Sequence, residues 1–190
     1  MNKRKHIAAL VVVLLSIFFG LSKSDLAPVS NWINPPKAGL ARVEEVMDGD
    51  TILVRFGSNT ERVRLIGVDT PETHHPNKAV QCYGEAASNF LHKLLDGEDV
   101  RLEADPTNTN RDRYDRLLRY VYTEDEELVN QKIIQEGYGF AYVGFPFEKK
   151  SDFKTSQEFA RDQNLGLWKS CDIDDLGDGR FNTAPASDAY

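Results

Sequence analysis

The segment VDTPETHHP, residues 68–76, places two carboxylates three residues apart directly after an apolar run. Asp69 stands where a strand would end, and Glu72 follows it. Asp50 comes just after a turn-like stretch and ahead of an earlier apolar run. If these two runs form adjacent strands, Asp50 and Asp69 meet, and two hard oxygen ligands suit Ca²⁺ or a similar cation.

Further groups with matching chemistry lie close to these carboxylates in the sequence. Pro71 biases Thr70 toward an extended backbone, which could turn the Thr70 carbonyl toward the same ion. Arg64 interrupts one apolar run and Arg116 opens a later one, and guanidinium forks match phosphate oxygens two at a time. Glu72 is then the candidate general base for a water that attacks a phosphodiester. Together these groups indicate metal-assisted phosphodiester chemistry.

Each of these features also has a purely structural interpretation. An Asp-Gly-Asp sequence such as residues 48–50 is often only a turn, and a lone arginine in a strand is often half of an ion pair. Tyr114 and Tyr142 could stack on a base or could simply cap a barrel. The chemical interpretation therefore depends on whether folding brings these residues together.

The elements that must position these residues follow from periodicity and turn signals. Alternating apolar residues predict five short strands, and apolar stripes at helical spacing predict three helices, the last with Ser151 as its N-cap. The expected strands lie in two stretches of 41–56, then in 60–69, 99–105 and 115–122, and the expected helices in 83–97, 128–137 and 151–166. Five strands with a helix between the third and fourth predict an α+β fold, a five-stranded Greek-key barrel of the OB-fold type.

The N-terminus differs in composition from the rest of the chain. A basic start precedes an uninterrupted apolar run over residues 7–21. Because a membrane span needs about 20 residues, this pattern predicts a cleaved signal peptide over residues 1–22, with a membrane anchor as the alternative. A linker (23–38), a barrel domain (39–171) and an acidic, flexible tail (172–190) follow. We expect a secreted or extracytoplasmic protein, or one that contacts the membrane through its N-terminal segment.

The charge of the exported chain restricts its partners. Without residues 1–22, the chain retains 20 basic residues against 30 acidic ones, a balance of −10. Tight non-specific binding of nucleic acid normally uses a basic surface, so this charge argues against such binding. A local site for a phosphate group remains compatible with it.

Two cysteines, Cys82 and Cys171, remain after export. In an oxidising compartment such a pair predicts a disulfide, which would close a long loop. The alternative is two separate thiols, whereas two cysteines without a histidine at ligand spacing do not predict a zinc site.

Several separated motifs, in the same order, resemble the staphylococcal nuclease (thermonuclease) family over roughly residues 41–168. The motifs are DGDT at 48–51, RLIGVDTPET at 64–73, YGEAAS at 83–88, DRYDRLLRYVY at 112–122 and GLW at 166–168. The resemblance implies an OB-fold barrel with three helices. It also implies a Ca²⁺-dependent nuclease that acts on DNA and RNA and cuts the 5′ P–O bond to leave 3′-phosphates.

The resemblance also assigns roles by position. It implies Asp50, Asp69 and the Thr70 carbonyl as calcium ligands, Arg64 and Arg116 as phosphate-binding groups, Glu72 as the base, and Arg113 and Tyr114 as contacts to a terminal phosphate. The segment AYVGF, residues 141–145, departs from the family pattern, because Tyr142 keeps one aromatic ring while Gly144 removes its neighbour. The departure affects base stacking and nucleotide preference.

Two functions from different classes remain. The first is a monomeric nuclease, which is favoured because the acids and arginines proposed for the chemistry are all present. These residues are Asp50, Arg64, Asp69, Glu72 and Arg116. The second is a non-catalytic OB-fold module that binds nucleic acid.

Overall fold

The computed structural model describes residues 37, 39–73 and 80–186. The predicted signal or anchor (1–22) lies outside the described residues, as does the predicted linker apart from Lys37. Among the residues described, no helix has the length and apolar character needed to cross a membrane.

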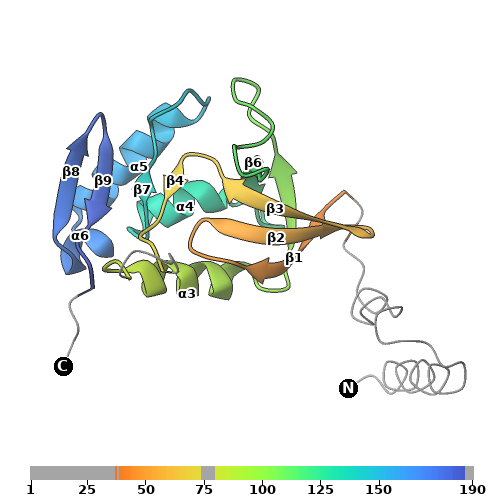
Figure 1. Cartoon of the computed structure of the whole chain (residues 1–190), viewed down its shortest axis with the longest axis horizontal. Helices are drawn as coiled ribbons and strands as arrows, with labels where there is room; N and C mark the ends of the chain where they lie inside the picture. The colour runs from red at the N-terminus through yellow and green to blue at the C-terminus, as the bar shows by residue number, and fades with distance from the viewer. Residues whose placement is uncertain (1–36, 38, 74–79, 187–190) are drawn as a thin grey trace, which may run out of the picture. The chain divides into compact units, whose positions relative to one another are not determined.

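Five strands close into a barrel in the order β1-β2-β3-β6-β5 (Figure 1). The strands are β1 (Ala41–Val46), β2 (Thr51–Phe56), β3 (Asn59–Leu65), β5 (Asp99–Glu103) and β6 (Leu117–Tyr122). All neighbours pair antiparallel except β3 and β6, which are parallel. The barrel confirms the predicted fold class. Its interior is filled by the inward-facing apolar residues of the strands, including Ile52, Val54 and Val63, which are fully buried.

Two short strands outside the barrel, β4 (Val68–Asp69) and β7 (Phe140–Ala141), pair antiparallel. The described helices are α3 (Gly84–Leu95), α4 (Val129–Gln135), α5 (Lys150–Asp162) and α6 (Leu167–Ser170). The first three correspond to the predicted helices, and the four-residue α6 was not predicted. The expected cap at Ser151 is wrong, because α5 already begins at Lys150 and has no side-chain cap.

The turn between β1 and β2 brings distant segments together. A Cβ atom at Gly49 would lie only 2.7 Å from the Thr70 hydroxyl oxygen, so glycine permits the close approach of the Thr70 side chain to this turn. Thr51 and Arg64 are opposite each other in the β2–β3 ladder. Asp50 therefore lies next to both Arg64 and the residue that follows β4.

The acidic C-terminal segment is not the flexible tail that its composition predicted. Ile173–Gly177 (β8) and Arg180–Thr183 (β9) form an antiparallel hairpin. Phe181 packs on Phe140 and Trp168, with ring centroids 5.8 and 5.6 Å apart. The acidic composition of this segment does not predict the hairpin, because the packing of one aromatic side chain helps to hold the hairpin against the rest of the protein.

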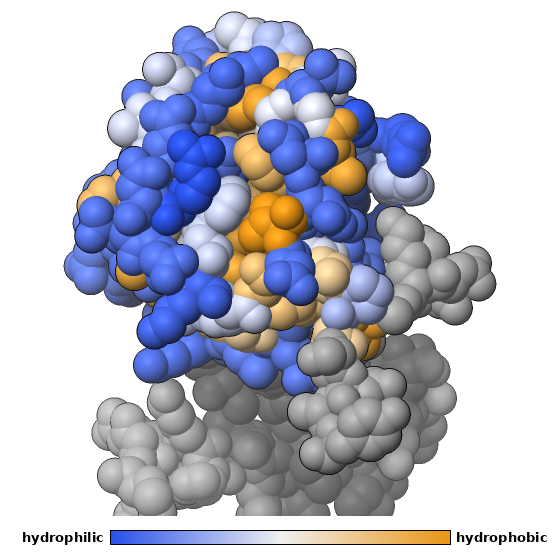
Figure 2. All heavy atoms as spheres, turned by 90° about the vertical axis from the view of Figure 1, so that its left-hand side faces the viewer, coloured by the Kyte–Doolittle hydropathy of each residue, from blue (hydrophilic) through white to orange (hydrophobic). Residues whose placement is uncertain are grey.

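The hairpin is also attached covalently. A disulfide joins Cys82 to Cys171, whose Cα atoms are 5.9 Å apart, and so connects the start of α3 to the residues just before β8. The face that carries the hairpin is turned toward the viewer in Figure 2, where hydrophilic side chains surround a smaller hydrophobic area.

Candidate active site

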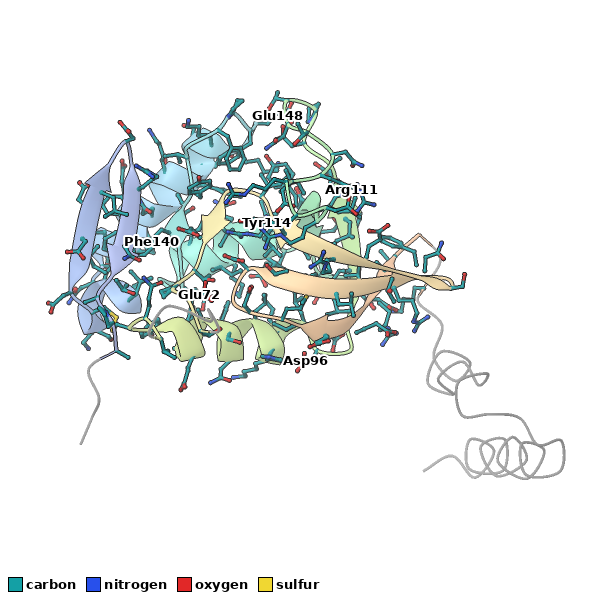
Figure 3. All side chains as sticks on the ribbon, viewed as in Figure 1. Glu72, Asp96, Arg111, Tyr114, Phe140 and Glu148 are labelled. Carbon is teal, nitrogen blue, oxygen red and sulfur yellow. A yellow bond between two sulfur atoms is a disulfide. The ribbon has the colours of Figure 1, made fainter. Side chains whose placement is uncertain are left out.

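A small cavity of about 170 Å³ brings the predicted catalytic and metal-binding residues together. Its lining consists of Asp48, Asp50, Arg64, Asp69, Thr70, Pro71, Glu72, Thr73 and Arg116. These residues come from the β1–β2 turn, the ends of β3 and β4, the segment after β4 and the residue before β6. In Figure 3, Glu72 lies on the segment between β4 and α3.

Asp50 is the most buried carboxylate of the cavity and is only 6% exposed. Its Oδ2 accepts hydrogen bonds from the Thr70 backbone nitrogen and hydroxyl, both at 3.2 Å. Its Oδ1 accepts a hydrogen bond from the Thr51 hydroxyl at 3.1 Å. Asp50 therefore fixes the segment after β4 against the start of β2.

Arg64 joins the two carboxylates that the sequence proposed as metal ligands. Its Nη1 lies 2.9 Å from Asp50 Oδ2, and its Nη2 lies 3.5 Å from Asp69 Oδ1. The guanidinium thus provides positive charge between two acids, which is the structural ion pair considered as an alternative. A cation at this site would share the two carboxylates with Arg64. A phosphate would share the Arg64 guanidinium with the two carboxylates.

Arg116 is oriented by Asp112. Its Nε and Nη2 both lie 2.7 Å from Asp112 Oδ2, and its Nη1 donates a hydrogen bond to the Thr51 hydroxyl at 3.3 Å. Burial would raise the pKa of Asp112, but hydrogen bonds from Arg116 and Tyr114 outweigh it and hold this pKa below its ordinary value. Asp112 is thus an ionised anchor that directs the guanidinium toward the cavity.

Asp48 belongs to the cavity but was not among the predicted site residues. Burial raises its pKa to about 7, and the neighbouring charge of Asp50 acts in the same direction. The hydrogen bond that Asp48 Oδ1 accepts from the Asp50 backbone nitrogen, at 3.0 Å, opposes this shift. The signal in the sequence is the first acid of the Asp-Gly-Asp turn, a position that is often structural.

The charges of Asp48 and Asp50 bear on whether a metal ion fits the small cavity. A raised carboxyl pKa marks a shortage of positive charge, which either a proton or a cation would relieve. Among the residues that the structure describes, no three His, Cys, Asp or Glu side chains gather as a metal site. A cation here would need backbone carbonyl or water oxygens besides the carboxylates, which Ca²⁺ accepts readily. The donor set therefore fits Ca²⁺ better than Zn²⁺.

A larger groove of about 710 Å³ shares Arg64, Asp69 and Arg116 with the small cavity. Its other lining residues are Leu65, Ile66, Gly67, Val68, Asp112, Arg113, Tyr114, Leu118, Tyr142 and Phe145. The Arg113 guanidinium lies 4.7 Å from the centroid of the Tyr114 ring, which is exposed in the groove (Figure 3). Because Tyr114 is 55% exposed, it does not serve as a buried cap of the barrel.

Phe145 was missed by the sequence analysis. Its ring centroid lies 5.4 Å from that of Tyr142, so a second aromatic ring accompanies Tyr142 in the groove. A Cβ atom at Gly144 would lie 3.5 Å from the Tyr142 ring, which is ordinary van der Waals contact, so this position has room for a Cβ atom. The only sequence signal was the phenylalanine one position beyond the missing aromatic residue.

Comparison with known proteins identifies the class. A sequence model of the family described as staphylococcal nuclease homologue matches residues 62–170. The chain is 44% identical over 128 residues to the thermonuclease of Staphylococcus intermedius, which covers 67% of this chain and 74% of that protein. The chain belongs to the staphylococcal nuclease family, as its motifs predicted.

Two further relatives show how the similarity is distributed. The chain is 38% identical over 130 residues to the thermonuclease of Staphylococcus hyicus, covering 68% of this chain and 75% of that protein. It is 40% identical over 128 residues to the SPbeta prophage-derived endonuclease YokF of Bacillus subtilis, covering 66% of this chain but 43% of that protein. The residues matched by the family model include Arg64, Asp69, Glu72 and Arg116 of the cavity, whereas Asp48 and Asp50 precede them.

Proposed function

We propose that this protein is a Ca²⁺-dependent nuclease that hydrolyses DNA and RNA by cutting the 5′ P–O bond and leaving 3′-phosphates. One observation carries the proposal: Asp50, Arg64, Asp69, Glu72 and Arg116 line one small cavity. Membership of the nuclease family supports it, as do the thermonuclease and endonuclease names of the relatives.

Each residue of the cavity has a separate role in the proposed reaction. Asp50, Asp69 and the Thr70 carbonyl would hold Ca²⁺, which supplies Lewis-acid stabilisation of the phosphate when bound. Arg64 and Arg116 bind the phosphate oxygens and stabilise the charge that develops on them. Their carboxylate partners orient both guanidinium groups before substrate arrives.

Glu72 is the proposed general base. It removes a proton from the attacking water, whose oxygen forms a new bond to phosphorus while the bond from phosphorus to the 5′ oxygen breaks. The 5′ oxygen takes up a proton and leaves as a hydroxyl. One water is consumed, and the phosphate remains on the 3′ side.

The larger groove would hold the nucleotide. Arg113 and Tyr114 would contact a terminal phosphate, and Tyr142 with Phe145 would provide a surface on which a base can stack. Because the exported chain is acidic overall, substrate binding should be weaker than in a basic nuclease.

We propose that the protein acts outside the cytoplasm as a monomer, with residues 1–22 as a signal peptide or residues 7–21 as a membrane anchor. The disulfide between Cys82 and Cys171 supports an oxidising compartment.

The alternative is a non-catalytic OB-fold module that binds nucleic acid. It is favoured by the ion pairs of Arg64 with Asp50 and Asp69, which are also what a purely structural network would contain. Such a module would bind single-stranded DNA without cleaving it.

The two functions separate in one experiment with the purified exported protein and denatured DNA. The nuclease should release 3′-phosphate ends with Ca²⁺ and none with a chelator, and Glu72→Gln should lower kcat by about 10³-fold without unfolding the protein. Binding of DNA with no cleavage by a folded, calcium-loaded protein would favour the module instead.

A further inference from the structure

Gln81 joins the backbone of Glu72 to the C-terminal hairpin. Its side-chain Oε1 accepts a hydrogen bond of 2.7 Å from the Glu72 backbone nitrogen. Its own backbone nitrogen donates a hydrogen bond of 2.9 Å to the Glu72 carbonyl. Both backbone polar groups of the proposed base are therefore held by a single residue nine positions further along the chain.

The other end of the Gln81 side chain is held by β9. Its Nε2 donates to Asn182 Oδ1 and, at 3.3 Å, to the Thr183 carbonyl. We call Gln81, with these contacts to Glu72, Asn182 and Thr183, the Gln81 bridge. Gln81 is not among the residues that line either the cavity or the groove, so it acts through Glu72 and not on the substrate.

The hairpin that holds Gln81 is itself firmly attached. Thr183, which is 1% exposed, donates a hydrogen bond of 2.9 Å from its hydroxyl to the Cys82 carbonyl. The Cys82 backbone nitrogen donates to the Ala184 carbonyl at 2.9 Å, and the disulfide fixes Cys82 to Cys171. Phe181 adds its packing on Phe140 and Trp168. The Gln81 bridge thus connects the proposed base to a rigid support.

We propose that the C-terminal hairpin positions Glu72 for catalysis through the Gln81 bridge, with Gln81 and Asn182 as positioning residues. The inference rests on the proposed function of Glu72 as the base. A displacement of about 1 Å at a reacting group can lower a rate by about 10²-fold, so the support of this backbone matters for kcat. The phosphate-binding arginines do not belong to the Gln81 bridge, so KM should depend on it little.

A first experiment removes the whole bridge or one of its contacts. Gln81→Met keeps the side-chain length but loses all three side-chain hydrogen bonds, whereas Asn182→Leu removes only the side-chain acceptor on β9 and leaves the Thr183 carbonyl. We expect kcat on denatured DNA to fall by about ten- to a hundred-fold for Gln81→Met and less for Asn182→Leu, with KM within about twofold. Asn182→Asp retains the acceptor and should restore most of kcat. Gln163→Met, at an exposed site after α5, is the matched control.

A double-mutant cycle shows whether Gln81 acts through Glu72. In the Glu72→Gln background, Gln81→Met should cause no further loss of kcat, because the positioned group is already absent. An equal loss of kcat in both backgrounds, or a change confined to KM, would overturn the proposal.

Amide hydrogen exchange tests the bridge without any activity. The Glu72 amide should exchange about tenfold faster or more in Gln81→Met and in Asn182→Leu than in the wild type or Gln163→Met. Unchanged exchange in both variants would show that the bridge does not restrain Glu72. If the wild type cleaves no DNA, the proposed function fails, whereas the restraint on Glu72 is still decided by this measurement.

Discussion

Asp105 and the acids of the cavity have different electrostatic surroundings. Asp105 is 5% exposed, and hydrogen bonds surround it: Thr107 donates through its backbone nitrogen at 2.8 Å and through its hydroxyl at 2.6 Å. The Tyr120 hydroxyl and the Glu148 backbone nitrogen donate to its other oxygen. Burial would raise the pKa of Asp105, but these donors together hold it below its ordinary value.

For Asp48 in the cavity, the pKa is shifted in the opposite direction. Asp48 lies beside the carboxylate of Asp50, and burial together with that charge raises the pKa of Asp48 to about 7. An acid whose neighbours donate hydrogen bonds contributes to stability, whereas a pair of adjacent acids carries a cost that only a proton or a cation can remove. Asp105 is therefore expected to maintain the fold, whereas Asp48 is expected to depend on a proton or a cation in the cavity.

The largest effect should come from neutralising an acid of the cavity. Asp50→Asn retains the shape of the side chain but removes one of the two proposed calcium carboxylates. We expect kcat/KM on DNA at saturating Ca²⁺ to fall by about 10³-fold while the protein stays folded. A variant that keeps most of the activity would remove Asp50 from the proposed site.

The next largest effect should be the gain in stability on calcium binding, which should depend on Asp50 in the cavity and not on Asp105. At a Ca²⁺ concentration of about 100 Kd, the wild type should gain about 2.7 kcal/mol in unfolding free energy. Thermal unfolding with and without chelator measures this gain, which should persist in Asp105→Asn and be absent in Asp50→Asn. An equal gain in all three proteins would place the ion elsewhere.

Asp105→Asn should affect stability and leave catalysis unchanged. It exchanges a charged acceptor for an amide that cannot match all of its donors, so we expect a loss of about 2 kcal/mol at pH 7. Because the folded-state pKa of Asp105 is lowered, its contribution is present above the ordinary pKa and disappears as the pH falls through the folded value. The difference between variant and wild type in denaturant unfolding should therefore shrink in acid.

The smallest effect, of opposite sign, is expected for Asp48→Asn in the metal-free protein. A raised folded-state pKa stabilises the fold below the ordinary pKa of aspartate, and this contribution is lost as the pH rises toward about 7. The amide cannot ionise, so above pH 7 the variant should be more stable than the wild type by about 1 kcal/mol, allowing for solvent screening. Denaturant unfolding at several pH values checks this, and a destabilised variant would contradict the assigned cause.

Much of this structure could be predicted from local patterns. The five barrel strands coincide with runs of alternating apolar residues separated by turn signals, and the glycines at positions 97 and 137 lie two residues after the ends of α3 and α4. Such features depend on contacts between residues that are close in the chain, so the sequence reports them directly. The order of the motifs was enough to indicate the family and most of the polar residues of the cavity, although not Asp48.

The electrostatic state of the site was decided by tertiary structure alone. Arg64 meets Asp50 and Asp69 only because β2, β3 and β4 meet at one end of the barrel, and the pKa of Asp48 depends on how deeply this turn is buried. No local pattern records the partners that a side chain finds across a fold.

The C-terminal hairpin and the Gln81 bridge show the same division between sequence and fold. By itself the sequence determined which residues could do the chemistry and which runs form the barrel, because residue type and periodicity are local properties. Only the tertiary structure decided that residues 173–183 pair as strands and that Gln81 contacts both Glu72 and β9. The contact of Gln81 with Asn182 joins residues 101 positions apart, and its energy depends on packing that exists only after the chain has folded.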